Sequence, residues 1–131
     1  MSQLEADRFA EGETMSRPWA ASTGAGSIIG CSVCNHKDEA LGRIKELMID
    51  LRSGKISYAV LSFGGLLGMG EKLFAVPWHA LTLDAKRERV VLSVRKELLA
   101  DAPGFDPDHW PDMADAAWAD DIHSFYGLKL H

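Results

Sequence analysis

One stretch of the chain decides the fold: residues 56–78, which read ISYAVLSFGGLLGMGEKLFAVPW. Its first part, residues 56–63, is rich in β-branched and aromatic side chains, which is typical of a strand. Because apolar residues fall on both faces after Ala59, we expect this strand to be buried on both sides. After a glycine-rich connection, residues 72–78 predict another short strand, which ends at proline.

The segments on either side of this stretch predict further strands. Residues 27–33 favour a first strand, and residues 81–84 and 89–94 flank a polar turn in the pattern of a hairpin. Residues 41–51 are ambiguous, because their apolar positions recur with the period of a helix, and periodicity alone favours a helix there. Five or six short strands separated by turns indicate a small closed β-structure.

The chain divides into three parts in this interpretation. Residues 1–26 are expected to be a flexible N-terminal arm, and residues 27–100 the folded domain. Residues 101–131 are expected to form an acidic loop and a helical tail that packs on the domain or on a partner. Asp108 resembles the N-cap of that helix, and after it residues recur at helical spacing, namely Trp110, Met113, Ala117, Asp121 or Ile122, and Phe125.

Composition narrows the class of protein. The 131 residues suit one domain, and 47% hydrophobic with 25% charged residues are ordinary values for a globular chain. A net charge of -5 argues against nucleic acid as the main partner. We find no secretory signal and no apolar run of the roughly 20 residues that a membrane span needs. Two cysteines without an export signal indicate free thiols in a reducing cytoplasm.

Two motifs carry candidate chemistry. Cys31 and Cys34 form a CxxC pair with His36 close by, but a structural zinc site usually needs a second such pair, so inert thiols are favoured over a metal or redox sensor. Residues 64–72 resemble a phosphate loop but lack the Gly-Lys-Ser/Thr ending. A tight β-connection is therefore favoured over a site for an anion or small ligand. No serine, histidine and acid arrangement indicates a catalytic site.

The chain has many large aromatic rings for its size. Most are expected in the core or under the tail helix, and some are candidates for anchors of a protein interface, where such rings are enriched. The candidate interface residues are Phe74, Trp78, Trp110, Trp118, Phe125 and Tyr126.

Several segments together resemble the PRC-barrel family, especially its stand-alone bacterial members. They are residues 41–50, 53–61, 63–65, 68–78, 102–105 and 110–111, so the resemblance extends over residues 27–127. It implies an all-β fold, a small barrel of about six strands with a short C-terminal helical extension, and it replaces the helix expected at residues 41–51 by a strand. The residues that carry it are expected to be architectural: Gly42, Asp50, Gly54, Gly64, Gly65, Gly68, Gly70, Lys72, Pro77 and Trp78.

The same resemblance implies a function without catalysis. The family includes the cytoplasmic domain of the photosynthetic reaction-centre H subunit and a domain of a ribosome maturation factor, and these relatives use the fold as a docking surface. We therefore predict a cytoplasmic protein-interaction or assembly module with no cofactor and no catalytic residue. Its predicted partner is another protein, which includes a homodimer or a higher homo-oligomer, and neither nucleic acid nor a membrane span is expected.

Overall fold

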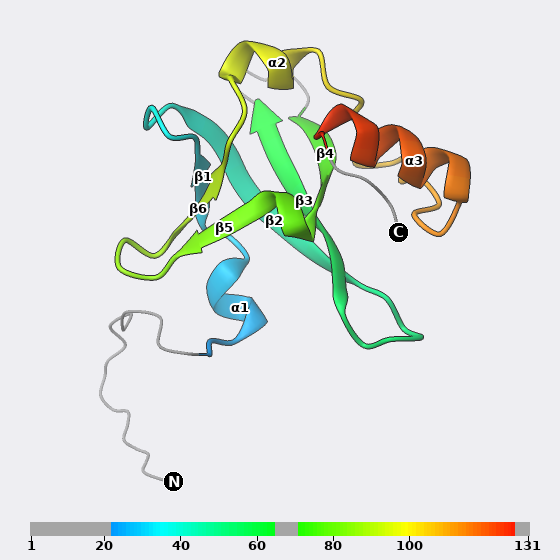
Figure 1. The fold of residues 1–131 in the computed structure, drawn as a ribbon, viewed down its shortest axis with the longest axis horizontal. Helices are drawn as coiled ribbons and strands as arrows, with labels where there is room; N and C mark the ends of the chain where they lie inside the picture. The colour runs from blue at the N-terminus through cyan, green and yellow to red at the C-terminus, as the bar shows by residue number, and fades with distance from the viewer. Residues whose placement is uncertain (1–21, 65–70, 128–131) are drawn as a thin grey trace, which may run out of the picture.

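A computed structural model describes residues 22–64 and 71–127 of the chain (Figure 1). Six strands and a short C-terminal helix confirm the all-β prediction. In chain order the elements are α1 (Ala25–Ile28), β1 (Ser32–Cys34), β2 (Ala40–Ile49), β3 (Ile56–Gly64), β4 (Glu71–Pro77), the 3-10 helix η2 (Trp78–Ala80), β5 (Leu81–Asp84), β6 (Arg89–Leu92), α2 (Lys96–Ala100) and α3 (Ala116–Phe125). No helix in the described ranges is long and apolar enough to cross a membrane.

The six strands form one sheet in the order β4-β3-β2-β1-β6-β5. Neighbouring strands are antiparallel except β1 and β6, which are parallel. The sheet curls into a half-barrel, and the long β2–β3 hairpin extends beyond it at the end of the molecule where α1 also lies (Figure 1). The curl gives the sheet an inner face, which holds the core, and an outer face.

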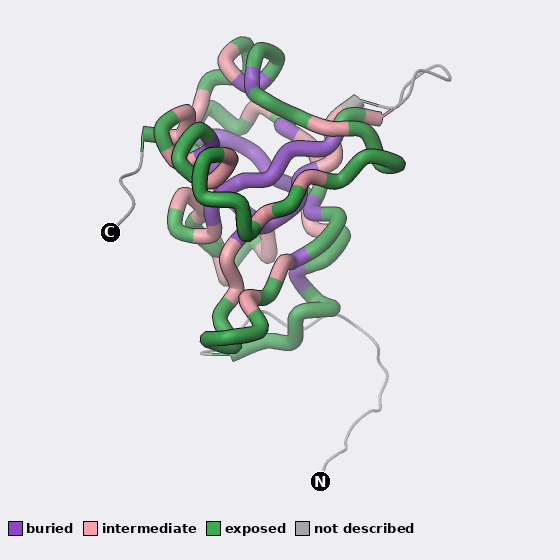
Figure 2. Tube along the Cα trace, turned by 90° about the vertical axis from the view of Figure 1, so that its right-hand side faces the viewer, coloured by how far each residue is buried: buried purple, intermediate pink, exposed green. Residues whose placement is uncertain are grey.

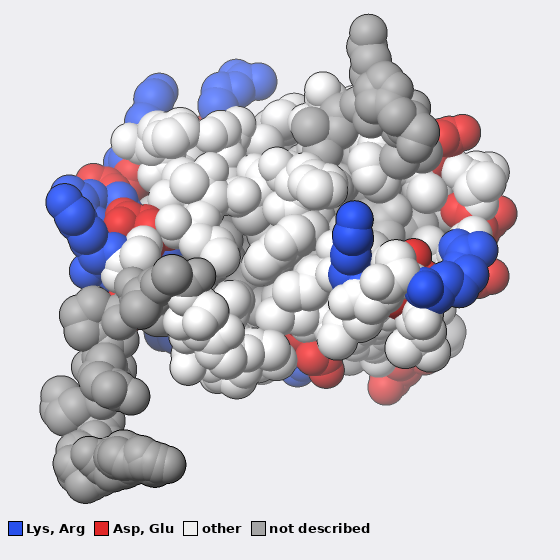
Figure 3. Space-filling model, turned by 60° about the horizontal axis from the view of Figure 1, so that its bottom comes forward, with Lys and Arg blue, Asp and Glu red and all other residues white. Residues whose placement is uncertain are grey.

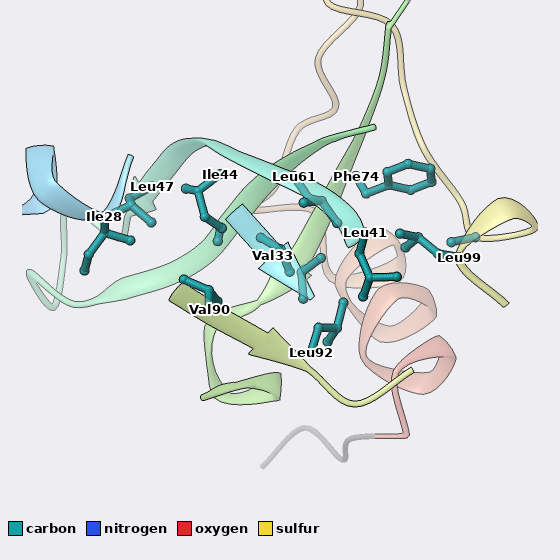
Figure 4. Close-up of a cluster of buried hydrophobic side chains, with 13 residues drawn as sticks. Ile28, Val33, Leu41, Ile44, Leu47, Leu61, Phe74, Val90, Leu92 and Leu99 are labelled. Atoms are coloured by element: carbon teal, nitrogen blue, oxygen red, sulfur yellow. The ribbon is translucent and has the colours of Figure 1, made fainter. Parts of the chain in front are cut away.

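The core lies on the inner face and draws on nearly every strand (Figures 2 and 4). Leu61, Phe74 and Leu92 are among its largest fully buried side chains. At one end of the cluster Ile28 of α1 lies beside Leu47 of β2 (Figure 4). The short helices α1 and α2, the latter through Leu99, thus each add a side chain to a core that the strands mainly supply.

Strand β3 is buried on both sides, as its sequence predicts. Ala59 and Leu61 belong to the inner core, whereas Tyr58 and Val60 point to the outer face, and all four are buried. Their partners on β4 follow the same alternation, since Val60 pairs with Ala75 and Leu61 with Phe74. The two strands therefore separate an inner from an outer apolar layer.

The strand β2 replaces the helix that periodicity favoured, as the family resemblance implied. Its buried residues Leu41, Ile44 and Leu47 recur every three positions because the register with its neighbours shifts repeatedly. The shifts toward β3 lie between Ile44 and Glu46 and between Met48 and Ile49. The irregularity between Ile44 and Glu46 leaves an extra residue on β2, so that Leu47 returns to the inner face one position off the strict alternation of a strand.

Two local predictions were wrong. The expected first strand at residues 27–33 is divided between the end of α1 and β1, which begins only at Ser32. The tail helix is capped by Asp115, whose carboxylate accepts a hydrogen bond from the Trp118 backbone N–H at 3.4 Å, and not by Asp108. The sequence pattern indicated the helix correctly but placed its start too early.

Candidate interaction surface

The two cysteines and His36 do not come together in a ligand set. The half-buried Cys31 donates to the Ser27 carbonyl at 3.0 Å, and Cys34 is buried on β1. Within residues 22–64 and 71–127, no three His, Cys, Asp or Glu side chains lie close enough to hold a metal ion. Burial, and after it the nearby Glu88 carboxylate, raises the pKa of the Cys31 thiol, so its reactive thiolate form is disfavoured.

His36 instead forms a hydrogen bond with Ser93, a pairing that the sequence analysis did not predict. Its Nε2 lies 2.6 Å from Oγ of Ser93, although the two residues are 57 positions apart. Both side chains are exposed, and in the described part of the chain no carboxylate hydrogen bonds to His36. A nucleophilic serine needs a base that is oriented by a third group, so this pair supports no catalytic role.

The glycine-rich connection between β3 and β4 falls mostly outside the described residues. The predicted positions Gly65, Gly68 and Gly70 lie there, and so does most of the candidate ligand loop. At its two ends, Gly64 pairs with Glu71 and closes the ladder between the strands. Glu71 accepts hydrogen bonds from Lys45, at 2.9 Å, and from the hydroxyl of Ser62.

Most of the candidate interface aromatics pack against other residues of the same chain. Phe74 is 0% exposed and belongs to the core, so its assignment to an interface was wrong. Trp78 and Phe125 are half-buried against the same core, and Trp118 packs on the outer face. Trp110 is 41% exposed and donates through its indole N–H to the Pro107 carbonyl at 2.7 Å.

Tyr126 completes this set and leads to a prediction. Its Oη is buried and has no hydrogen-bond partner among the described residues, and burial raises the pKa of the phenol. Tyr126→Phe removes a polar group whose desolvation nothing visible offsets, so we expect the free energy of unfolding to stay equal or rise by up to about 1 kcal/mol. Chemical denaturation compares the two proteins, and a clear loss of stability would mean that the hydroxyl has a partner.

Among the other exposed large apolar side chains of the described residues, Leu51 is 93% exposed in the β2–β3 turn, and three lie at the end of α1, on β2 and on β5. Ile29, Ile49 and Leu83 are 38%, 54% and 38% exposed. Leu83 pairs with the buried core residue Val90, and Ile49 pairs with Ile56, which packs against the core. Because directly opposed residues share a face of the sheet, Leu83 and Ile49 continue the inner face to the surface.

We call this region the open-end surface; it consists of Ile29, Ile49, Ile56, Trp78, Leu81 and Leu83. Figure 3 shows the molecule from this end: apart from one basic side chain to the right of the centre, the middle carries no charged atoms, and the other Lys, Arg, Asp and Glu side chains lie around its edge. Adjoining exposed apolar side chains with a charged rim are typical of protein interaction sites. Of these residues, sequence reasoning named only Trp78 as a candidate for an interface; the others were assigned to expected strands or to the ambiguous segment at residues 41–51.

Three charged residues connect the turns near one end of the sheet. Arg89 of β6 bonds Asp38 of the β1–β2 turn at 2.8 Å and Asp84 of β5 at 3.2 Å. The Arg89 hydrogen bond, with its positive charge, lowers the pKa of the Asp38 carboxyl below its ordinary 3.8. This contact therefore stabilises the fold above the unfolded-state pKa of Asp38, and the contribution is lost as the pH falls through the lower folded value.

Asp38→Asn is accordingly expected to make Tm fall less steeply on acidification below about pH 4. The reason is that Asn cannot bind the proton that the Asp38 carboxyl takes up as the pH falls. Calorimetric Tm values from pH 7 downward would show this. The matched control is Asp120→Asn, since Asp120 is exposed on α3 and forms no ion pair with any described residue. Parallel pH profiles for the two variants would contradict the linkage.

Comparison with known proteins shows to which family this sequence is similar. The family model described as PRC-barrel domain matches residues 24–99, which is more than half of the chain. No curated protein matches the sequence. The matched region includes all six strands, α1 and all of α2 except its last residue, and it ends before α3.

Proposed function

Since the chain belongs to the PRC-barrel domain family, we propose that it is a non-enzymatic interaction module that binds another protein through the open-end surface. Domains of this family serve interaction and assembly and are generally not catalytic. The observation that carries the proposal is the continuation of the inner face from the core to the exposed side chains of Ile49 and Leu83. A partner that covers these side chains would remove apolar area from water, which is the main driving force of association.

The charge distribution supports a protein as the partner. A nucleic-acid site needs Lys and Arg along the contact face, whereas the middle of this surface is largely uncharged (Figure 3). A second copy of the chain is included among the candidate partners, because an apolar face of this kind can be self-complementary about a two-fold axis. We propose that the protein works in the cytoplasm. Its two free cysteines support this, because a reducing compartment keeps thiols from forming disulfides.

The alternative functions have less support. A metal or redox sensor at Cys31, Cys34 and His36 has no ligand set of three side chains in the described residues, and the pKa of the Cys31 thiol is raised. A ligand loop at residues 64–72 lies largely outside the described ranges. Neither has an observation of its own that favours it.

A photo-crosslinking amino acid at position 83 tests the proposal in cells of the source organism. Leu83 lies on the inner face, and its neighbour Thr82 is exposed on the opposite face, so Thr82 is the matched control for expression and background. We expect one dominant protein adduct from position 83 and none from position 82. The mass of the adduct distinguishes a second copy from another protein, and equal adducts at both positions would contradict the proposal.

Ile49→Asp provides the complementary test with the partner so identified. Ile49 is more than half exposed, so the substitution is expected to change Tm little, while the buried charge at the interface weakens binding at least about 10-fold. Ser53→Asp, in the turn of the same hairpin, is the control for added charge. Binding that survives Ile49→Asp unchanged would place the contact elsewhere.

A further inference from the structure

The outer side of the sheet carries a second apolar surface, which we call the outer β3–β4 face. It consists of Tyr58 and Val60 on β3 and Leu73 and Ala75 on β4, and each of these side chains is at most 5% exposed. Val60 and Ala75 are directly opposed in the ladder, and Tyr58 and Leu73 lie at the positions that alternate onto the same face. The inner core lies on the other side of the same two strands, so this face needs its own cover.

The C-terminal segment supplies that cover. Phe105 forms two backbone hydrogen bonds with Leu73, of 2.9 and 2.8 Å, and its ring lies 5.1 Å from that of Trp110. Trp118 of α3 meets Tyr58 edge-on at 5.2 Å, and His123 lies 5.7 Å from the same ring. Aromatic contacts of this geometry contribute beyond the area they bury.

Helix α3 contacts this face along one stripe. Trp118, Ile122 and Tyr126 pack in the same cluster as Tyr58 and Ala75, and they lie at positions i, i+4 and i+8. The residues between them on the other side of the helix, including Asp120 and Asp121, are exposed. This is the pattern of an amphipathic helix laid into an apolar groove, a recurring mode of peptide recognition.

The cover lies outside the matched family region, although its last residues Phe125 and Tyr126 also pack against the inner core. The matched family region ends at residue 99, and every covering residue, from Phe105 to Tyr126, follows it. Between α2 and α3, residues 101–115 contain no helix or strand apart from the single bridge at Phe105. The helix is thus held to the face by side-chain contacts and by a long irregular connection.

We infer that the outer β3–β4 face is a binding site for an amphipathic helix, which α3 fills in the isolated chain and for which a partner helix competes. The partner helix would carry an aromatic, an aliphatic and a further aromatic anchor at the spacing of Trp118, Ile122 and Tyr126. Because α3 is tethered, it acts at a high effective concentration, and a partner helix binds only as α3 opens locally. This inference concerns a surface other than the open-end surface and does not depend on it.

The test uses the full chain and a fluorescent peptide of its own residues 111–127. Ile122→Asp places a charge in the buried centre of the contact and is expected to release α3, so this variant should bind the peptide at least ten-fold more tightly than the unaltered chain does. Asp121→Ala, on the exposed side of α3, is the control and should behave like the unaltered chain. A peptide that itself carries Ile122→Asp should bind to none of them.

Two outcomes overturn the inference: an Ile122→Asp chain that keeps its sheet but binds no peptide, or peptide binding as tight to the unaltered chain as to the variant. NMR amide signals of β3 and β4 report whether the sheet is kept. Should the variant unfold, hydrogen exchange in the unaltered chain decides. We expect α3 amides to exchange at least ten-fold faster than those of β3 and β4, and equal rates would show that α3 opens only on global unfolding.

Discussion

Gly42→Ala is expected to lower the free energy of unfolding by about 3 kcal/mol or more, which for a domain of this size threatens folding itself. Gly42 has a φ of 137°, a conformation that side chains rarely adopt. A Cβ at this position would lie 2.2 Å from the carbonyl oxygen of Ser62 and 3.1 Å from Leu61 Cδ1. The oxygen belongs to the neighbouring strand β3, so it cannot move away without disturbing the β2–β3 ladder.

Gly54→Ala is the matched control for this prediction. Gly54 also has a positive φ, 76°, but a Cβ there would meet no atom within 4 Å. Its cost should therefore be limited to the left-handed conformation, about 1 kcal/mol. Urea denaturation of both variants measures the difference, and equal losses would mean that backbone conformation alone, and not the approach of β3, requires glycine at position 42.

Strands β2 and β3, which meet at Gly42, differ in how well the sequence predicts them. The strand at residues 56–63 is predictable because its β-branched and aromatic residues favour a strand and its apolar residues fall on both faces, and the structure buries both faces. The strand β2 is not predictable from period, because its register shifts place Leu41, Ile44 and Leu47 on one face at a spacing that a helix would also give. Only the family resemblance, which includes Gly42, indicated a strand there.

The candidate interaction surface could not be derived from residue types. Leu81 and Leu83 have the same side chain on the same strand, yet Leu81 packs against the core and Leu83 is partly exposed at its edge. The difference depends on what the fold places over each position, and strand β5 alone does not contain that information. Likewise Ile28 is buried and Ile29 exposed because α1 ends between them.

Phe74 and Trp110 illustrate the same limit, since both were candidates for an interface and the structure separates them. Phe74 is fully buried in the inner core, where its ring centroid lies 6.5 Å from that of Phe63, whereas Trp110 is 41% exposed. Phe74→Ala would leave a cavity in the core, and we expect it to cost about 3 to 5 kcal/mol of unfolding free energy. Trp110→Ala removes mainly its contact with Phe105 and should cost about 1 kcal/mol.

Denaturation midpoints of the two variants test whether burial, rather than aromatic character, determines what each ring does. A small loss for Phe74→Ala would mean that the inner face repacks around the missing ring. We do not expect this, because Leu61, Val76 and Leu99 belong to the same buried cluster and close-packed side chains have little freedom to move. A loss for Trp110→Ala as large as that for Phe74→Ala would mean that the segment over the outer β3–β4 face is part of the folding core. That result would also count against a cover that opens locally, so this pair of substitutions bears on both the fold and the helix-binding inference.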